Sequence, residues 1–257
     1  MKQIQRVLLA ALVFVTAVPA VSARQMTTPK DGRALLEQMR AAYLGKWFTT
    51  LTFVQKTTIV RADDTRTEQT WFESMRSPGT LRIDVAPLAN GNGSLNYPDK
   101  VIAMRGGKIA NTRPDGNPFL PFVAGIYTQP IDDSIAQLAP QKFDLGAMHV
   151  TDYQGRRTFV VGTTKKDDLA VPQFWIDAER LVATRVLIAS GTSMLDITLD
   201  NYIKTGNSWV AIKVAMSSGG KLRQIEEYTD VKTDVELSPE LFDPATWMTE
   251  KHWAKGR

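Results

Sequence analysis

The chain of 257 residues contains no cysteine. This absence excludes disulfides, thiolate metal sites, cysteine nucleophiles and a lipid-modified N-terminal cysteine. Histidine is scarce as well, because only His149 and His252 are present and neither has a second ligand at the spacing of a known metal motif. The sequence therefore predicts a protein without a bound metal.

The motifs of common enzyme classes are also missing. No GxSxG turn, no GxGxxG loop after a strand and no GxxxxGKS/T loop is present, so we predict neither a catalytic residue nor a cofactor. A hydrolase of envelope lipids is a minor alternative, which ester turnover lost on a single Ser or Asp substitution would favour. Four acidic pairs are interpreted as exposed surface residues, since carboxylates are mostly solvated: Asp63-Asp64, Asp132-Asp133, Asp167-Asp168 and Glu226-Glu227.

Only the N-terminus contains a sustained apolar run, over residues 7–17. Lys2 and Arg6 precede it and small residues end at Ala23, which is the order of a secretory signal peptide. A membrane anchor is the alternative, but a spanning helix needs roughly 20 apolar residues. We predict a signal peptide over residues 1–23, a single domain over residues 24–257, and a soluble protein of the bacterial periplasm.

Strong net charge is absent too. The formal charge is +4, and it falls to +2 when Lys2 and Arg6 are removed with the signal peptide. A protein of such low charge is not expected to bind nucleic acid.

The remaining sequence predicts one helix followed by many strands. Residues 28–47 place Leu35, Leu36 and Met39 at helical spacing on one face. Short β-like runs separated by turn residues then favour a meandering antiparallel sheet. These runs cover residues 50–61, 66–76, 79–86, 99–105, 107–112, 148–153, 157–163, 172–178, 181–190, 193–204, 208–217 and 220–231.

Residues 113–147 interrupt the strand pattern. They contain five prolines, the apolar stretch from Phe119 to Tyr127, and a short helical pattern over residues 131–138. Prolines at this density do not belong in central strands, so we expect this segment to cover one face of the sheet. A curved sheet covered in this way would leave an apolar hollow, in which an acyl chain gains about 0.8 kcal/mol for each buried CH₂.

Several short segments carry a resemblance to a known family. They are LTFVQK at 51–56, WFESM at 71–75, RSP at 76–78, LRID at 81–84, FWID at 174–177, the run 181–188, EEY at 226–228 and LSPELF at 237–242. In this order, after a signal peptide and an amphipathic helix, they resemble the LolA family of periplasmic lipoprotein carriers and the wider group of outer-membrane lipoprotein-sorting proteins. The resemblance covers nearly the whole mature chain in outline, although each segment is degenerate.

The resemblance implies a mainly β fold of the α+β class. This is a half-open antiparallel β-barrel of roughly 10–12 strands with an N-terminal helix and a short helical lid. It also implies an apolar cavity for acyl chains, an inner-membrane donor and an outer-membrane acceptor. Arg76 would help hold the lid, the other interpretation being an exposed cation at a strand end. The chain departs from the family at residues 105–111 and in the segment 86–98, which we interpret as an insertion.

The leading hypothesis is a non-enzymatic periplasmic protein that binds, carries or senses lipids or lipoproteins. The alternative is a regulatory module that binds an envelope protein, as in periplasmic regulators of anti-sigma factors. The expected cavity and lid residues are Leu35, Leu36, Met39, Phe53, Trp71, Arg76, Ile83, Met104, Phe119, Phe122, Ile126 and Trp175.

Overall fold

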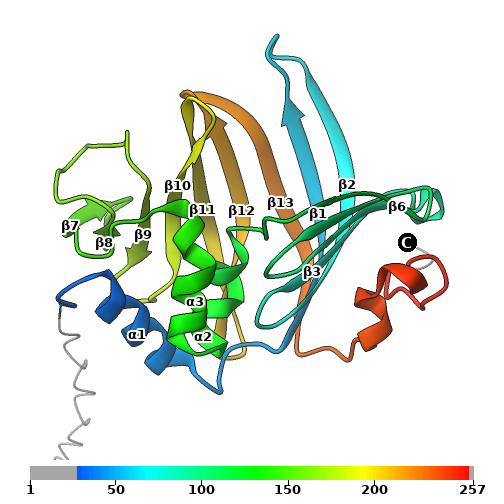
Figure 1. Cartoon of the computed structure of the whole chain (residues 1–257), viewed down its shortest axis with the longest axis horizontal. Coiled ribbons are helices and arrows are strands. Elements are labelled where there is room, and N and C mark those ends of the chain that lie inside the picture. The colour runs from blue at the N-terminus through cyan, green and yellow to red at the C-terminus, as the bar shows by residue number, and fades with distance from the viewer. Residues whose placement is uncertain (1–27, 255–257) are drawn as a thin grey trace, which may run out of the picture.

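The computed structural model of the chain describes residues 28–254, and the predicted signal peptide lies outside this range. Within it the strands form one antiparallel sheet of 13 strands in the order β6-β5-β4-β3-β2-β1-β13-β12-β11-β10-β9-β8-β7 (Figure 1). Every strand therefore pairs with its neighbour in sequence, except that β1 also pairs with β13 and β6 does not meet β7. The sheet is strongly curved and is not closed.

The strands have the following bounds: β1 Thr50–Val60, β2 Arg66–Arg76, β3 Thr80–Val85, β4 Asn92–Asn96, β5 Val101–Arg105, β6 Lys108–Arg113, β7 Met148–Tyr153, β8 Arg156–Val161, β9 Gln173–Asp177, β10 Ala183–Ser190, β11 Ser193–Thr205, β12 Ser208–Ser218 and β13 Lys221–Thr233. Twelve of the thirteen coincide with the predicted runs. The predicted half-open antiparallel barrel is confirmed.

Strand β4 is the one that the sequence pattern missed. It lies in the segment that was interpreted as an insertion, and its sequence NGSLN has a single apolar residue, Leu95, which is buried. Gly93 permits the close pairing with β3, because a Cβ there would lie 1.9 Å from the carbonyl oxygen of Ile83. A polar, glycine-containing segment gives no alternation to detect, although it is a full member of the sheet.

The N-terminal helix α1 spans Gly32–Tyr43 and is shorter than the predicted 28–47. It begins after Asp31, whose side chain accepts a hydrogen bond from the backbone N–H of Ala34 at 2.8 Å. It ends where Leu44 leaves the helical conformation. Four further elements follow in the connection between β6 and β7: a π-helical turn Pro121–Gly125, α2 Ile126–Thr128, α3 Ile131–Leu138 and a 3-10 turn Ala139–Gln141.

The connection between β6 and β7 crosses the concave face of the sheet. These two strands form opposite edges of the sheet, so the chain must pass from one edge to the other. Figure 1 shows α2 and α3 in front of β11 and β12, with α1 beside them. We call residues 119–129 the lid. None of the helices in residues 28–254 is long and apolar enough to cross a membrane.

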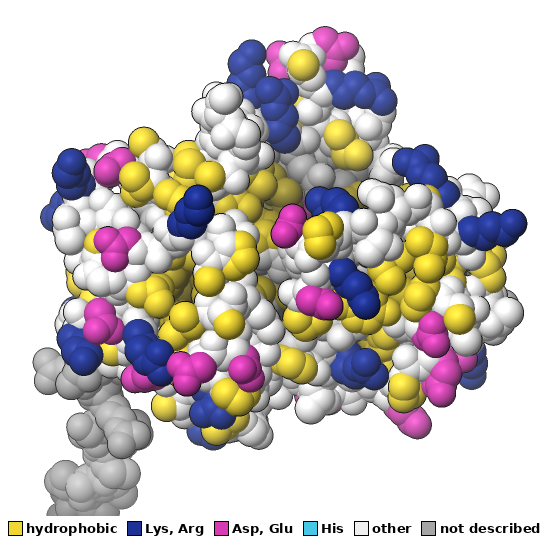
Figure 2. All heavy atoms as spheres, viewed as in Figure 1, with side chains coloured by type: hydrophobic (Ala, Val, Ile, Leu, Met, Phe, Trp, Pro, Cys, Tyr) yellow, Lys and Arg dark blue, Asp and Glu magenta, His cyan; other side chains and the backbone are white. Residues whose placement is uncertain are grey.

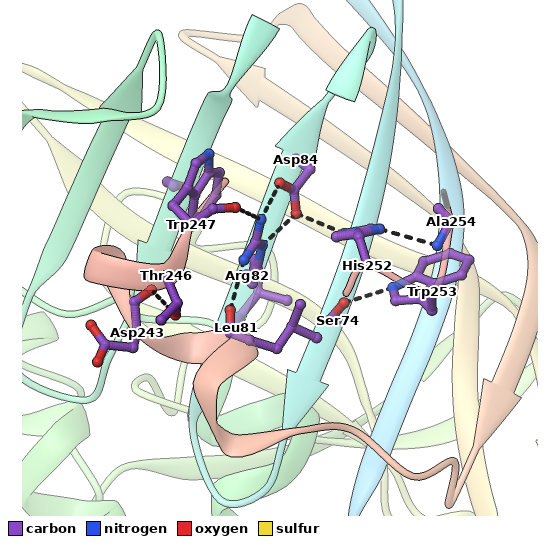
Figure 3. A network of polar contacts seen from close by, with 12 residues as sticks. Ser74, Leu81, Arg82, Asp84, Asp243, Thr246, Trp247, His252, Trp253 and Ala254 are labelled. Atoms are coloured by element: carbon purple, nitrogen blue, oxygen red, sulfur yellow. Dashed lines mark hydrogen bonds and ion pairs between the residues drawn. The ribbon is translucent and has the colours of Figure 1, made fainter. Parts of the chain in front are cut away.

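Residues 238–254, the C-terminal segment, pack against the opposite face of β3. Arg82 and Asp84 point to that face, whereas Leu81 and Ile83, which alternate with them along the strand, point to the lid side. The Arg82 guanidinium binds the Asp84 carboxylate at 2.7 and 2.8 Å (Figure 3). His252 Nε2 also lies 3.0 Å from Asp84, so a buried ionic network holds this segment on the sheet.

Candidate ligand-binding cavity

An apolar cavity lies between the concave face of the sheet and the lid. Its volume is about 970 Å³ with its open mouth included. Figure 2 shows the hollow on this face, with hydrophobic side chains in its depth and charged side chains mainly around it. The lining comes from β1–β3, from β11–β13, from the lid and from the loops that precede β1, the lid and β10. It comprises Trp47, Phe48, Leu51, Phe53, Trp71, Glu73, Met75, Leu81, Ile83, Asn117, Phe119, Leu120, Phe122, Val123, Tyr127, Val182, Ile197, Leu199, Tyr202, Trp209, Val210, Ala211, Val214, Met216, Glu226 and Tyr228.

Strand alternation decides which side chains enter the cavity. On β2 the inward residues are Trp71, Glu73 and Met75, and on β13 they are Glu226 and Tyr228. The sequence showed the alternation on β11 and β12, but it did not show which side faced the hollow. The lid decides this, because it covers one face only.

Five of the twelve expected site residues line the cavity: Phe53, Trp71, Ile83, Phe119 and Phe122. Phe53 lies on β1 and stacks on Tyr228 of β13, with ring centres 4.3 Å apart. Phe119 and Phe122 enter from the lid. The structure thus brings together the aromatic residues of the first strands and of the proline-rich segment.

Four expected residues are completely buried and do not reach the cavity. Leu35, Leu36 and Met39 of α1 and Ile126 of the lid have no exposed surface and form the core beside it. An amphipathic helix buries its apolar face against whatever covers it, and here that partner is the lid and the sheet. These residues support the lid and do not offer a surface to a ligand.

Three expected residues lie elsewhere in the fold. Met104 packs with Leu241 and Phe242 of the C-terminal segment. Trp175 faces the outside of the sheet, because Phe174 and Ile176 on either side of it point into the core. The aromatic run in β9 gave no indication of which of its members pointed inward.

Arg76, the third of these residues, does not hold the lid. It is exposed at the end of β2, and its guanidinium carbon lies 5.0 Å from the centre of the Phe242 ring. The lid is held instead by Arg40 and Trp47: Arg40 Nε donates to the Gln129 carbonyl at 2.7 Å, and Trp47 Nε1 donates to the Val123 carbonyl at 2.9 Å. Arg76 does not contact the lid because side chains alternate along β2, and its own side chain points away from the face that the lid covers.

Two carboxyls in the cavity were not expected. Glu226 was interpreted as an exposed residue of an acidic pair, but only 6% of its surface is exposed, whereas Glu227 points outward. Burial raises the pKa of Glu226, although hydrogen bonds from Tyr228 and Gln224 oppose the shift. Burial also raises the pKa of Glu73 well above its usual value, and the neighbouring Glu226 carboxyl adds to this. The alternation on β2 and β13 was the signal that could have located both.

The cavity wall contains none of the usual nucleophiles or metal ligands beyond these carboxyls. Among its described residues there is no Ser, Thr, Lys, Arg or His. Residues 28–254 contain no group of three His, Asp or Glu side chains placed to hold a metal ion. His252 lies in the ionic network on the other face, and His149 Nδ1 lies 2.9 Å from the Thr163 carbonyl oxygen.

Comparisons with known proteins show a similar fold. No protein-family model matches the sequence, and none of the curated proteins matches it either. Among solved structures, a DUF1329 family protein from Desulfovibrio piger has a TM-score of 0.57 and 11% identity, covering 84% of this chain and 97% of that one. A putative outer membrane lipoprotein-sorting protein domain from Vibrio parahaemolyticus has a TM-score of 0.54 and 13% identity, with 83% and 97% covered. A LolA superfamily protein from Nitrosomonas europaea has a TM-score of 0.49 and 9% identity, covering 82% of this chain and 97% of that one.

The first two of these structures show the fold of the chain. The resemblance to the lipoprotein-sorting group, inferred from short degenerate segments, is therefore confirmed for the fold. At 11% and 13% identity the likeness concerns the backbone arrangement.

Proposed function

We propose that the protein is a non-enzymatic lipid-binding protein whose cavity takes up the acyl chain of a lipid or lipoprotein. The observation that carries the proposal is the apolar cavity between the curved sheet and the lid, with side chains of both in its wall. An acyl chain placed there leaves water and gains about 0.8 kcal/mol for each buried CH₂. Ordering of the chain and loss of translational freedom reduce this gain.

The proposed setting is the periplasm, where the protein would carry or sense lipids between the inner and outer membranes. The predicted signal peptide supports export, and the similarity in fold to the putative lipoprotein-sorting protein domain from Vibrio parahaemolyticus supports a link to lipoprotein sorting. An inner-membrane donor and an outer-membrane acceptor are the partners that such a route requires. We assign no residue a catalytic role.

The first experiment is native mass spectrometry, with organic extraction, of the protein purified from a periplasmic fraction without detergent. We expect a bound lipid or acylated peptide at a defined stoichiometry, which extraction would identify. A clean unliganded mass, together with no binding of added neutral long-chain amphiphile, would contradict the proposal. It would favour the module that binds an envelope protein.

A substitution that fills the cavity supplies a structural test. Met216 of β12 is half-buried and lines the cavity, so Met216→Trp should occupy space that the acyl chain needs. We expect at least about a tenfold loss of affinity for a long-chain alcohol, equivalent to about 1.4 kcal/mol. The matched control is Ala215→Trp, since this neighbour is also half-buried but does not line the cavity. Equal losses in both variants would show that the site lies elsewhere.

A further inference from the structure

The ionisable groups of the cavity wall are all acids, so any charge that they take is negative. Among the described residues in its wall, the ionisable side chains are two carboxyls, Glu73 and Glu226, and three tyrosines, Tyr127, Tyr202 and Tyr228. No lysine, arginine or histidine belongs to this wall. A ligand with an anionic headgroup would therefore meet no counter-ion inside, whereas a cationic headgroup would.

The two carboxyls differ in their hydrogen bonds. Both oxygens of Glu226 have donors, because Gln224 Nε2 donates to Oε1 and the Tyr228 hydroxyl donates to Oε2, each at 2.6 Å. The Tyr228 ring is itself fixed by stacking on Phe53. Glu226 is thus part of a completed local network and needs no ligand to satisfy it.

Glu73 has no such network. Only 5% of its surface is exposed, yet no residue in 28–254 donates a hydrogen bond to it or forms an ion pair with it. Its cross-strand neighbours are Phe53 on β1 and Ile83 on β3, both in the cavity wall. A buried carboxyl without a protein partner is rare in folded proteins, and this one lies in the cavity wall, where a water molecule or a ligand held in the cavity supplies the partner.

A carboxyl in this position is suited to a ligand with a strong donor. A primary ammonium provides three N–H donors, and its positive charge stabilises the ionised form of the carboxyl that burial alone disfavours. The surrounding Trp71, Met75 and Ile83 offer only apolar surface to the rest of the ligand. The site therefore combines one anionic anchor with an apolar enclosure.

We propose that Glu73 anchors the amino group of a cationic amphiphile, so that the cavity prefers an apolar chain ending in a primary amine over the matched alcohol or fatty acid. This inference rests on the proposed function, because it requires that the cavity accept an apolar chain. It adds the chemical class of the ligand and the residue that recognises it.

The test compares three probes of equal chain length: tetradecylamine, tetradecanol and tetradecanoic acid. Each displaces a neutral fluorescent amphiphile from the full mature protein at pH 7. We expect the amine to bind about tenfold more tightly than the alcohol, and the acid to bind more weakly than the alcohol. Equal affinities of amine and alcohol, or the tightest binding by the acid, would overturn the headgroup assignment while leaving the acyl-binding proposal intact.

Glu73→Gln then tests the anchoring residue. Glutamine keeps the size of the side chain and can still form neutral hydrogen bonds, so only the charge is lost. We expect the ratio of the affinity for the amine to the affinity for the alcohol to fall from about ten in the wild type to about one in the variant. The matched control is Glu227→Gln, because Glu227 is exposed and points away from the cavity. An amine preference that persists in Glu73→Gln overturns the assignment to Glu73.

Two further results separate this inference from the proposed function. If none of the three probes binds the wild-type protein, both the acyl-binding proposal and the inference fail together. If the alcohol binds but the amine preference is absent, only the inference fails. The wild-type comparison decides this without any variant, and circular dichroism of Glu73→Gln shows whether its fold is retained.

Discussion

Glu73 and Arg76 lie three residues apart on β2 and point to opposite faces of the sheet. The sequence resemblance directed attention to Arg76, which is exposed, while the buried carboxyl was overlooked. Residue type alone predicts that both side chains are exposed, since Glu and Arg are normally solvated. That prediction is right for Arg76 and wrong for Glu73. The position along the strand outweighs residue type here, because alternate residues of a half-buried strand face the core whatever their chemistry.

The raised pKa of Glu73 predicts a pH-dependent stability effect. The folded state keeps the Glu73 proton to a higher pH than the unfolded chain does. The free energy of unfolding is therefore highest while Glu73 is protonated in both states, and it falls as the pH rises above the unfolded pKa. Between about pH 4.3 and the folded pKa, the wild type should lose up to about 1.4 kcal/mol per pH unit relative to Glu73→Gln. Urea unfolding of both proteins from pH 4 to pH 9 measures the difference. A constant difference over this range would contradict the prediction.

At the scale of elements, the lid is held by contacts with α1 and with the turn that follows it. Trp47 donates to the Val123 carbonyl, and its ring stacks on Tyr127 with centres 3.8 Å apart. Ile126 is completely buried beside these contacts, so a charged substitution there would disrupt packing and could not report on ligand uptake alone. Phe119 and Val123 are half-buried and line the cavity, which makes them the informative lid positions.

Trp47→Phe should loosen the lid without unfolding the sheet. The variant keeps an aromatic ring but leaves the Val123 carbonyl without its donor, which costs about 1–3 kcal/mol. We expect faster amide exchange in residues 119–129, measured by hydrogen–deuterium exchange, and little change in β8–β10. Trp71→Phe is the control, because Trp71 Nε1 donates to Gln69 on the same strand and not to the lid. Similar exchange in both variants would show that this hydrogen bond does not hold the lid.

The C-terminal segment depends on a different kind of interaction, the buried ionic network of Figure 3. Burial opposes ionisation of Asp84, but hydrogen bonds from His252 and Arg82 outweigh it and lower the pKa of Asp84. A lowered pKa means that this carboxylate stabilises the fold above about pH 4 and that the contribution is lost as the pH falls through the folded pKa. The docking of this segment is therefore sensitive to acid.

Asp84→Asn should cost about 3 kcal/mol at pH 7, because it leaves the buried Arg82 guanidinium without its anionic partner. The difference from the wild type should begin to shrink below about pH 4, where Asp84 binds a proton in the unfolded wild-type chain while the folded carboxylate still keeps its charge. Urea unfolding at pH 7 and at pH 3 measures both values. Asp115→Asn, at an exposed position, should change neither. An equal cost at both pH values would mean that packing, and not charge, explains the loss.

At the scale of the whole molecule, the sequence predicted most of the sheet because its hairpins join strands that are adjacent in both sequence and space. Twelve strands were found in this way, and β4 was missed because its polar sequence alternates weakly. The candidate cavity was harder to predict. Its members depend on which face the lid covers and on the pairing of β1 with β13, which joins the two halves of the cavity wall from opposite ends of the chain. Local patterns contain no information on that contact, so Trp175 and Met104 were expected inside, Glu226 was expected outside, and no position was predicted for Glu73.

The path of the chain through the lid has a mechanical consequence. The lid belongs to the connection that joins β6 and β7, the two free edges of the sheet, so it is attached at both ends. A flap fixed at one end can swing away and admit cargo of any girth, whereas this segment acts as a tether of fixed length between the rims. Both ends of this segment would move with the rims if the sheet spread, so its hydrogen bonds to Arg40 and Trp47 oppose that movement. The position of the lid and the separation of the two rims are thus coupled through one segment of the chain.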